Sequence, residues 1–185
     1  MKFFSFFTSC LGLLIILILF GLIAASLAGV DIPYLSQVLY KESPKLDRVV
    51  LVSADRGKNQ LQKIATGSVV LDESDFSSIL SAGFMSRTPY IKLVKTNIYP
   101  DKIKLLITFG KGRDYYFFAT LIPANDGGKL NIKSAQVGNL PIPIFAARWF
   151  LGNALDLSNV FKGYGLRVNN MNLNDGEIQL NFVKK

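Results

Sequence analysis

The chain opens on a long run of apolar positions. Phe3 to Val30 comprises 28 residues without a charged side chain, rich in Leu, Ile, Phe and Ala and without proline. As one helix this run would extend about 42 Å at about 1.5 Å per residue, beyond the roughly 30 Å of a bilayer's hydrocarbon core. The pattern therefore predicts a transmembrane anchor over residues 1–30.

Two features bear on how this anchor would be used. Ser26-Leu27-Ala28 resembles the cleavage site of a signal peptide, but the apolar run is about twice the usual length of such a segment, about 7–15 residues. We therefore expect an uncleaved, single-pass anchor, with cleavage as the alternative. A short head before a long tail favours export of the tail. The expected location is the bacterial inner (cytoplasmic) membrane, with an extracytoplasmic C-terminal domain.

Residues 31–46 are predicted to form a juxtamembrane stem. Pro33 suits a first helical turn, Tyr34, Leu35 and Val38 share one face, and Pro44 would end the helix. Residues 47–185 then form the extracytoplasmic domain. Two helices are expected there. The first covers residues 73–85 and begins after Asp72, an N-cap residue, and the second covers Ile144–Leu155, with a broken continuation over Leu157–Phe161.

Alternating and doubly apolar runs predict the strands. They are Asp47–Ser53, Ser68–Leu71, a strand from about Tyr90 to the turn at Tyr99-Pro100-Asp101, Lys102–Phe109, Tyr115–Ile122, Leu130–Val137, Leu166–Leu173 and Glu177–Val183. Gly138 to Pro143 is expected to break the sheet, and Asn174-Asp175-Gly176 is a strong hairpin signal. The predicted fold class is α+β, a mainly antiparallel sheet with two helices on one side, preceded by one N-terminal transmembrane helix.

The two halves of the predicted domain resemble each other, since each reads strand, helix, hairpin. At an offset of 75 positions, four apolar residues of one hairpin match four of the other: Ile98, Ile103, Leu105 and Ile107 against Leu173, Ile178, Leu180 and Phe182. Independent convergence of two hairpins explains this match about as well as an internal strand-helix-hairpin duplication does, so both interpretations stay open.

Composition excludes several kinds of chemistry. The chain of 185 residues has no histidine and one cysteine, which rules out a Ser-His-Asp triad, an imidazole metal site, an intramolecular disulfide and a thiolate zinc site. Asp72, Glu73 and Asp75 cluster, but they stand at a predicted helix start, where the helix dipole favours acids. We therefore expect no catalytic residue, no metal, no cofactor and no enzymatic activity.

One short motif suggests a family. A strand that ends in Gly138-Asn139-Leu140-Pro141-Ile142-Pro143 and leads into an apolar helix resembles the YpmS-like bacterial proteins. That resemblance implies one N-terminal span and an extracytoplasmic α+β domain, and it carries no activity over to residues of this chain. The order of strand, helix and hairpin is also similar, more remotely, to tubular lipid-binding folds, which is an analogy of fold alone.

The formal net charge of +8 draws attention to basic residues between Arg87 and Arg113. Those predicted to touch an anionic surface are Lys92, Lys95, Lys102, Lys104, Lys111 and Arg113. The alternative is a solvated outer face whose lysines protect an edge strand. Nucleic acid is not an expected partner, because the aromatic residues sit within apolar strands and are not interleaved with the cations.

The apolar residues suggest a ligand site between sheet and helix. Tyr115, Phe117 and Trp149 would line a groove for an acyl chain, with Leu140, Pro141 and Pro143 at its rim. The alternative is that these aromatic residues simply fill the core.

Together these features predict a membrane-anchored, non-catalytic envelope protein. It would bind a lipid or another apolar ligand, or an envelope partner, close to the membrane surface. The alternative function is that of a structural or assembly subunit of a membrane complex that docks through its span and stem.

Overall fold

The computed structural model describes residues 12–22, 46–53, 67–86, 88–110, 114–125, 127–162 and 165–184, together with a few single positions. Its labelled elements are β1 (Gly67–Asp72), α4 (Glu73–Met85), β2 (Ile91–Tyr99), β3 (Lys102–Phe109), β4 (Tyr115–Pro123), β5 (Leu130–Val137), β6 (Leu140–Pro141), α5 (Ile144–Leu151), the 3-10 helix η1 (Gly152–Leu155), α6 (Leu157–Phe161), β7 (Leu166–Asn174) and β8 (Glu177–Lys184).

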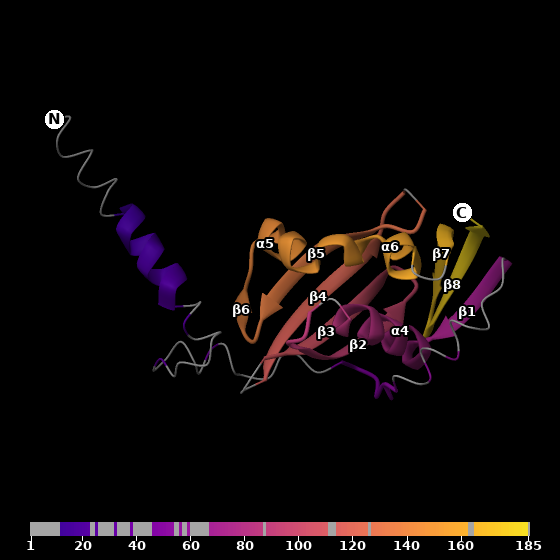
Figure 1. The fold of residues 1–185 in the computed structure, drawn as a ribbon, viewed down its shortest axis with the longest axis horizontal. Coiled ribbons are helices and arrows are strands. Elements are labelled where there is room, and N and C mark those ends of the chain that lie inside the picture. The colour runs from indigo at the N-terminus through magenta and orange to yellow at the C-terminus, as the bar shows by residue number, and fades with distance from the viewer. Residues whose placement is uncertain are drawn as a thin grey trace.

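The strands form two antiparallel sheets (Figure 1). The larger sheet has five strands in the order β2-β3-β4-β5-β6, and the smaller has three in the order β1-β8-β7. The helix α4 connects the two sheets, because it leaves β1 in the smaller sheet and leads to β2 at an edge of the larger one. The fold is α+β with antiparallel strands, but the single sheet that the sequence predicts is in fact two.

The core lies on one face of the larger sheet. The inward residues of β3 and β4 alternate along each strand, as a pleated sheet with one covered face requires. They are Ile103, Leu105 and Ile107 of β3 and Tyr115, Phe117, Ala119 and Leu121 of β4, and all are buried. The run α5–η1–α6 covers this face, and Phe150 of α5 packs against Phe117 with 4.8 Å between ring centroids.

The hairpins β2–β3 and β7–β8 have the same register. Ile98 pairs with Ile103 in one, and Leu173 pairs with Ile178 at the same distance from a two-residue turn in the other. The residues matched at the offset of 75 positions therefore occupy corresponding places, and all eight are buried. The hairpins lie in different sheets, because β8 pairs with β1 whereas β3 pairs with β4.

The structure contradicts the predicted N-terminal transmembrane helix. Within the part of the chain that the structure describes, no helix is long and apolar enough to cross a membrane. The helix described there covers residues 12–22, or about 16 Å at about 1.5 Å per residue, against the roughly 30 Å that a span needs. Most of the predicted stem, residues 31–46, lies outside the described residues.

The predicted number of helices also differs from the structure, whose described residues include four: the helix over residues 12–22, α4, α5 and α6. The second predicted helix ends earlier than Leu155, because α5 stops at Leu151, and the broken continuation expected over Leu157–Phe161 is the separate helix α6. Gly152 causes the break, because its φ of +50° ends α5 and only a residue without a side chain adopts that region readily.

Two smaller predictions differ from the structure as well. Leu140 and Pro141 do not break the sheet but form the short strand β6, which pairs with Val137 and Gln136 of β5. Residues 47–53 are not a strand, because they pair with side chains and not with a neighbouring strand. The amide of Arg48 donates to Oδ1 of Asn97 at 3.0 Å, and that of Ser53 donates to Oγ of Ser78 at 3.1 Å.

Candidate functional site

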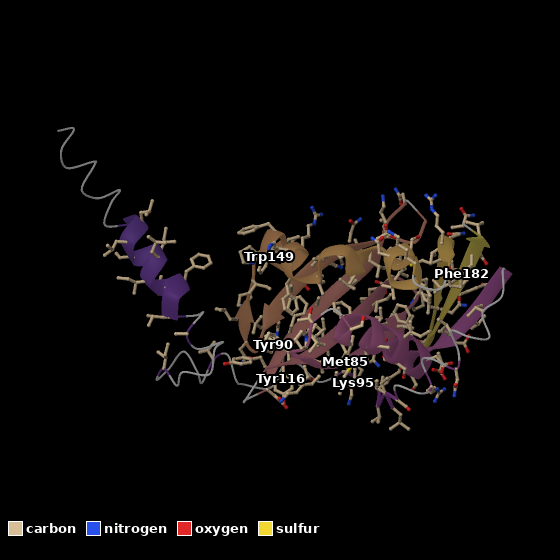
Figure 2. All side chains as sticks on the ribbon, viewed as in Figure 1. Met85, Tyr90, Lys95, Tyr116, Trp149 and Phe182 are labelled. Atoms are coloured by element: carbon tan, nitrogen blue, oxygen red, sulfur yellow. The ribbon has the colours of Figure 1, made fainter. Side chains whose placement is uncertain are left out.

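An apolar groove opens between α4, α5 and α6. It has a volume of about 320 Å³, at the lower end of the range of small-molecule sites, about 300–1,000 Å³. Its lining residues come from two segments of the chain, residues 80–91 and 149–160: Leu80, Gly83, Phe84, Thr88, Ile91, Trp149, Phe150, Leu151, Ala154 and Val160. The helices around it are labelled in Figure 1, and Trp149 of α5 is labelled in Figure 2.

The wall contributed by α4 depends on a glycine. Leu80 and Phe84 lie one turn apart on the helix, and Gly83 stands between them. A Cβ at Gly83 would lie 3.6 Å from Cγ1 of Val160, which is ordinary van der Waals contact. The groove therefore has room for a methyl group at this position, but a longer side chain would project into the groove or displace α6.

The floor of the groove is aromatic. Phe150 lies between the groove and the sheet, with ring centroids 4.8 Å from Phe117 and 5.4 Å from Phe109. Tyr115 stacks on Phe109 at 5.5 Å. A second, almost filled space of about 10 Å³ lies deeper, and it shares Leu80, Phe84, Leu151 and Ala154 with the groove. The groove thus rests on a close-packed layer and does not cut through the core.

The rim is formed by the outer side of α5. Trp149 lines the groove and yet is 87% exposed, so the indole lies at the mouth. Phe145 precedes it by one turn and is 75% exposed, and Ile144 is 43% exposed. The opposite side of the helix is buried through Ala147 and Leu151. The helix α5 therefore has one packed side and one side of large exposed apolar residues.

The position of α4 is fixed by three polar side chains that lie four residues apart along the helix. Glu73, Ser77 and Ser81 each accept a hydrogen bond from an edge-strand amide, those of Ile98, Thr96 and Val94, at 2.8, 2.8 and 2.9 Å. Residues four apart lie on one face of a helix, and alternate amides of a strand point to one side. The helix therefore satisfies the free edge of β2, which an unpaired strand would otherwise leave open.

The acidic residues at the start of α4 have structural partners. Asp72 is the N-cap and its Oδ1 accepts from the amide of Asp75 at 2.7 Å. Arg56 pairs with Asp75 at 2.5 Å and with Asp72 at 2.8 Å. These pairings raise the pKa of the Arg56 guanidinium, first through the hydrogen bond to Asp75. The cluster is a helix cap with a counter-ion, as the sequence indicated.

A second polar cluster lies at the turn of β2–β3. Asp47 accepts hydrogen bonds from Lys104, at 2.6 Å, and from the Tyr99 hydroxyl. The hydrogen bond from Lys104, and then that from Tyr99, lowers the pKa of the Asp47 carboxyl, and the bond to Asp47 raises the pKa of Lys104. Burial, followed by the hydrogen bond to Asp47, raises the pKa of Tyr99. Asp47, Tyr99 and Lys104 therefore all have hydrogen-bond partners within this group. Such an arrangement is typical of a structural contact, and we call these three residues the Asp47 clasp.

The predicted apolar site residues are only partly brought together. Trp149 lies at the groove, whereas Tyr115 and Phe117 are buried in the layer beneath it, at 2% and 0% exposure. Leu140 is half-buried, and Pro141 and Pro143 are exposed; none of the three lines the groove. The sequence analysis missed the wall of α4 and Val160 of α6. The small residue Gly83 among the apolar residues of that helix was the available signal.

The predicted basic residues mostly lie beside acids. Lys92 pairs with Asp114 at 2.5 Å, Lys102 lies 3.6 Å from Asp101, and Lys104 binds Asp47. Lys102 and Lys104 also stand over the ring of Tyr99, at 5.5 and 5.3 Å from its centroid. Lys95 is half-buried on β2. Lys111 and Arg113 lie outside the described residues.

The described residues contain no group of three or more Cys, Asp or Glu placed to hold a metal ion. Comparison of the chain with protein-family models and with curated proteins found no match. The function therefore has to be inferred from the groove and its surroundings.

Proposed function

We propose that this protein is a non-catalytic binding protein that holds a single acyl chain in the groove between α4, α5 and α6. The observation that carries this proposal is an apolar groove of about 320 Å³ whose mouth is an exposed tryptophan. The side chains of the lining are apolar, except for the Thr88 hydroxyl and the Trp149 indole N–H. Such a surface suits a ligand with a long apolar part and one polar end.

The residues at the mouth also agree with a ligand of this shape. Indole combines a large apolar surface with one hydrogen-bond donor, so Trp149 can cover a chain while its N–H faces a polar headgroup. Thr88 lies between α4 and β2, at the other side of the lining from α5. A chain in the groove would contact Leu80 and Phe84, with the packed ring of Phe150 beneath it.

A direct test uses the fact that Trp149 is the only tryptophan of the chain. The full chain, kept in solution with an amphipathic polymer, is titrated with a fatty acid that carries a nitroxide in mid-chain. We expect saturable quenching of Trp149 at a stoichiometry of one. Quenching that rises linearly without saturation would contradict the proposal.

A matched pair of variants at one position provides the control. Gly83→Leu would fill the groove and displace about two methylene groups of the ligand, at about 0.8 kcal/mol each, so binding should weaken by about tenfold or more. Gly83→Ala adds only a methyl at ordinary contact distance from Val160 and should bind like the original chain. Equal affinity in both variants would place the ligand elsewhere.

The remaining expectations from the sequence stay predictions. These are the extracytoplasmic location, the resemblance to the YpmS-like proteins, an envelope partner, and the alternative role as an assembly subunit. The last rests on residues that lie largely outside the described ones. Val38 is described, and its carbonyl accepts a hydrogen bond from the amide of Asn139 at 3.2 Å, next to β6.

A further inference from the structure

The outer side of α5 carries a continuous group of large exposed residues. Ile144, Phe145, Arg148 and Trp149 have the spacing of one helical stripe, and we call them the α5 face. Phe145 and Trp149 are 75% and 87% exposed, so most of each aromatic side chain is open to solvent. Single exposed apolar side chains are ordinary, but a neighbouring set of this size on one helix marks an interaction surface.

Charge identifies what the α5 face would contact. Between Gly138 and Leu173 the chain has three basic residues, Arg148, Lys162 and Arg167, and one acid, Asp156. Lys162 and Arg167 line an open, polar hollow of about 390 Å³ beside α6, together with Lys129 and the single acid Asp156, so cations outnumber acids there. The helical run α5–η1–α6 lies along one side of the larger sheet (Figure 1). Arg148 lies in α5 and Lys162 follows directly after α6, so these two cations belong to the same helical run as the α5 face.

We propose that the α5 face docks on the surface of an anionic lipid bilayer. Phe145 and Trp149 would enter the boundary between headgroups and acyl chains, where amphipathic aromatic rings are favoured. Arg148 and the cations beside α6 would face the headgroups, and each basic residue near such a surface strengthens binding roughly fivefold. This combination of exposed aromatic and basic residues on one helical layer is typical of interfacial membrane contacts.

The α5 face is a better candidate for contact with an anionic bilayer than the lysines of β2 and β3. Lys92 and Lys104 of those strands are paired with Asp114 and Asp47, which reduces their attraction for an external anion. The helix α5 also has large exposed apolar side chains, whereas β2 and β3 have none. Docking does not require the groove to hold a chain, but the groove opens at Trp149, so it would open toward the bilayer.

The test uses the full chain and a readout confined to α5. The helix over residues 12–22 exposes Leu and Ile side chains and offers a bilayer a second contact, so total binding to vesicles is not informative. Instead, Trp149 fluorescence is recorded with phosphatidylglycerol vesicles whose acyl chains are brominated. We expect quenching by bromine, a shift of the emission to shorter wavelength, and reduced quenching by acrylamide from the water.

Variants separate docking from other causes. Phe145→Asp should abolish the bromine quenching, and Arg148→Glu should weaken docking roughly 25-fold because it reverses one charge. Val49→Asp is the control, because Val49 is 93% exposed and belongs to the segment that contacts the first half of α4. Neither change at α5 affects a buried residue, and circular dichroism verifies that both variants fold.

Three outcomes would overturn the proposal. Trp149 that stays open to acrylamide on vesicle-bound protein would show that the α5 face remains in water. Equal quenching in phosphatidylcholine vesicles would exclude recognition of anionic lipid. Shielding of Trp149 that grows with protein concentration without lipid would assign the α5 face to a second copy of the chain. Loss of fatty-acid binding in Gly83→Leu does not change any of these three measurements. A failure of the groove proposal can therefore be distinguished from a failure of the docking proposal.

Discussion

At the scale of single residues, a small number of polar side chains holds the two sheets together. Arg48 donates to Glu73 at 3.1 Å and to the carbonyl of Ile98 at 3.4 Å, and it also pairs with Asp175. The amide of Gly176 donates to the same carbonyl at 3.0 Å. The turn of β7–β8 is therefore fastened to β2 across the junction of the sheets.

The Asp47 clasp predicts a pH-dependent contribution to stability. The pKa of Asp47 is lowered in the folded protein, so its ionised form stabilises the fold above the ordinary pKa of an aspartate, and this stabilisation is lost as the pH falls through the lowered native value. Asp47→Asn should therefore unfold at lower urea than the original chain at about pH 7, and the difference should shrink at an acid pH below the lowered native pKa of Asp47. A constant difference at both pH values would show that the carboxylate charge is not responsible.

Replacement by alanine is expected to have opposite effects on the free energy of unfolding at two glycines. A Cβ at Gly128 would lie 2.7 Å from Cβ of Val168, a branched residue in β7 that cannot move aside easily. Gly128→Ala should therefore lower the free energy of unfolding by about 1–3 kcal/mol. Gly83→Ala, within α4, should raise it by about 0.5–1 kcal/mol, because alanine favours helix and meets only an ordinary contact. Urea unfolding of both variants measures the signs, and equal signs would contradict this reading.

At the scale of elements, α4 acts as the missing neighbour of β2. The helix covers the free edge with three side chains in place of a sixth strand. This explains why Ser77 and Ser81 are buried in a helix whose other inward side chains include Phe76 and Leu80. The same contact brings Leu80 and Phe84 to the groove.

The edge contact makes a prediction about Ser77. Its hydroxyl lies 2.8 Å from Oγ1 of Thr96 and 2.8 Å from the amide nitrogen of Thr96. Ser77→Ala leaves both groups buried without this partner, which should cost about 1–3 kcal/mol of unfolding free energy and speed hydrogen exchange at the Thr96 amide. Ser74→Ala, on a half-buried position of the same helix, is the control and should change neither quantity measurably. Unaltered exchange at Thr96 in Ser77→Ala would contradict the role of α4 as an edge cover.

Local signals predicted most individual elements correctly. The N-cap at Asp72 and the spacing of Phe76, Ile79 and Leu80 gave the bounds of α4, and the turn residues gave both long hairpins. The pairing of β1 with β8 was not predictable in this way, because it joins residues more than a hundred positions apart through backbone groups that every residue carries. For the same reason the sequence predicted one sheet.

The candidate site was predictable only in part. Trp149 could be identified as a candidate site residue because a tryptophan among apolar residues belongs either to the core or to a contact surface. Tyr115 and Phe117 were expected in the groove because their strand is apolar on both faces, but both are buried, with Phe150 packed on Phe117 and Phe109 stacked on Tyr115. The wall of α4 depends on how that helix packs against β2, which no local pattern reports. The predicted membrane span is not found among the described residues, where no helix is long and apolar enough to cross a membrane.

At the scale of the whole molecule, the groove and the α5 face belong to one layer. The larger sheet supports α5, η1 and α6 on its covered face, and the smaller sheet holds the far end of α6 through Phe161, whose ring meets Phe182 at 5.0 Å. The mouth of the groove and the exposed aromatic residues share Trp149. The two proposals are therefore linked at Trp149, because the proposed acyl-chain groove opens beside the surface proposed to dock on a bilayer.

The central claim is that the groove holds one acyl chain, and native mass spectrometry of the full chain tests it most directly. The protein is purified from its cells, released gently from the amphipathic polymer, and compared with Gly83→Leu and Gly83→Ala. The account predicts one added mass per chain that resolves as a fatty acid or phospholipid in the original protein and in Gly83→Ala, and that is lost from Gly83→Leu. A folded original chain without added mass, even after incubation with fatty acid, would contradict it.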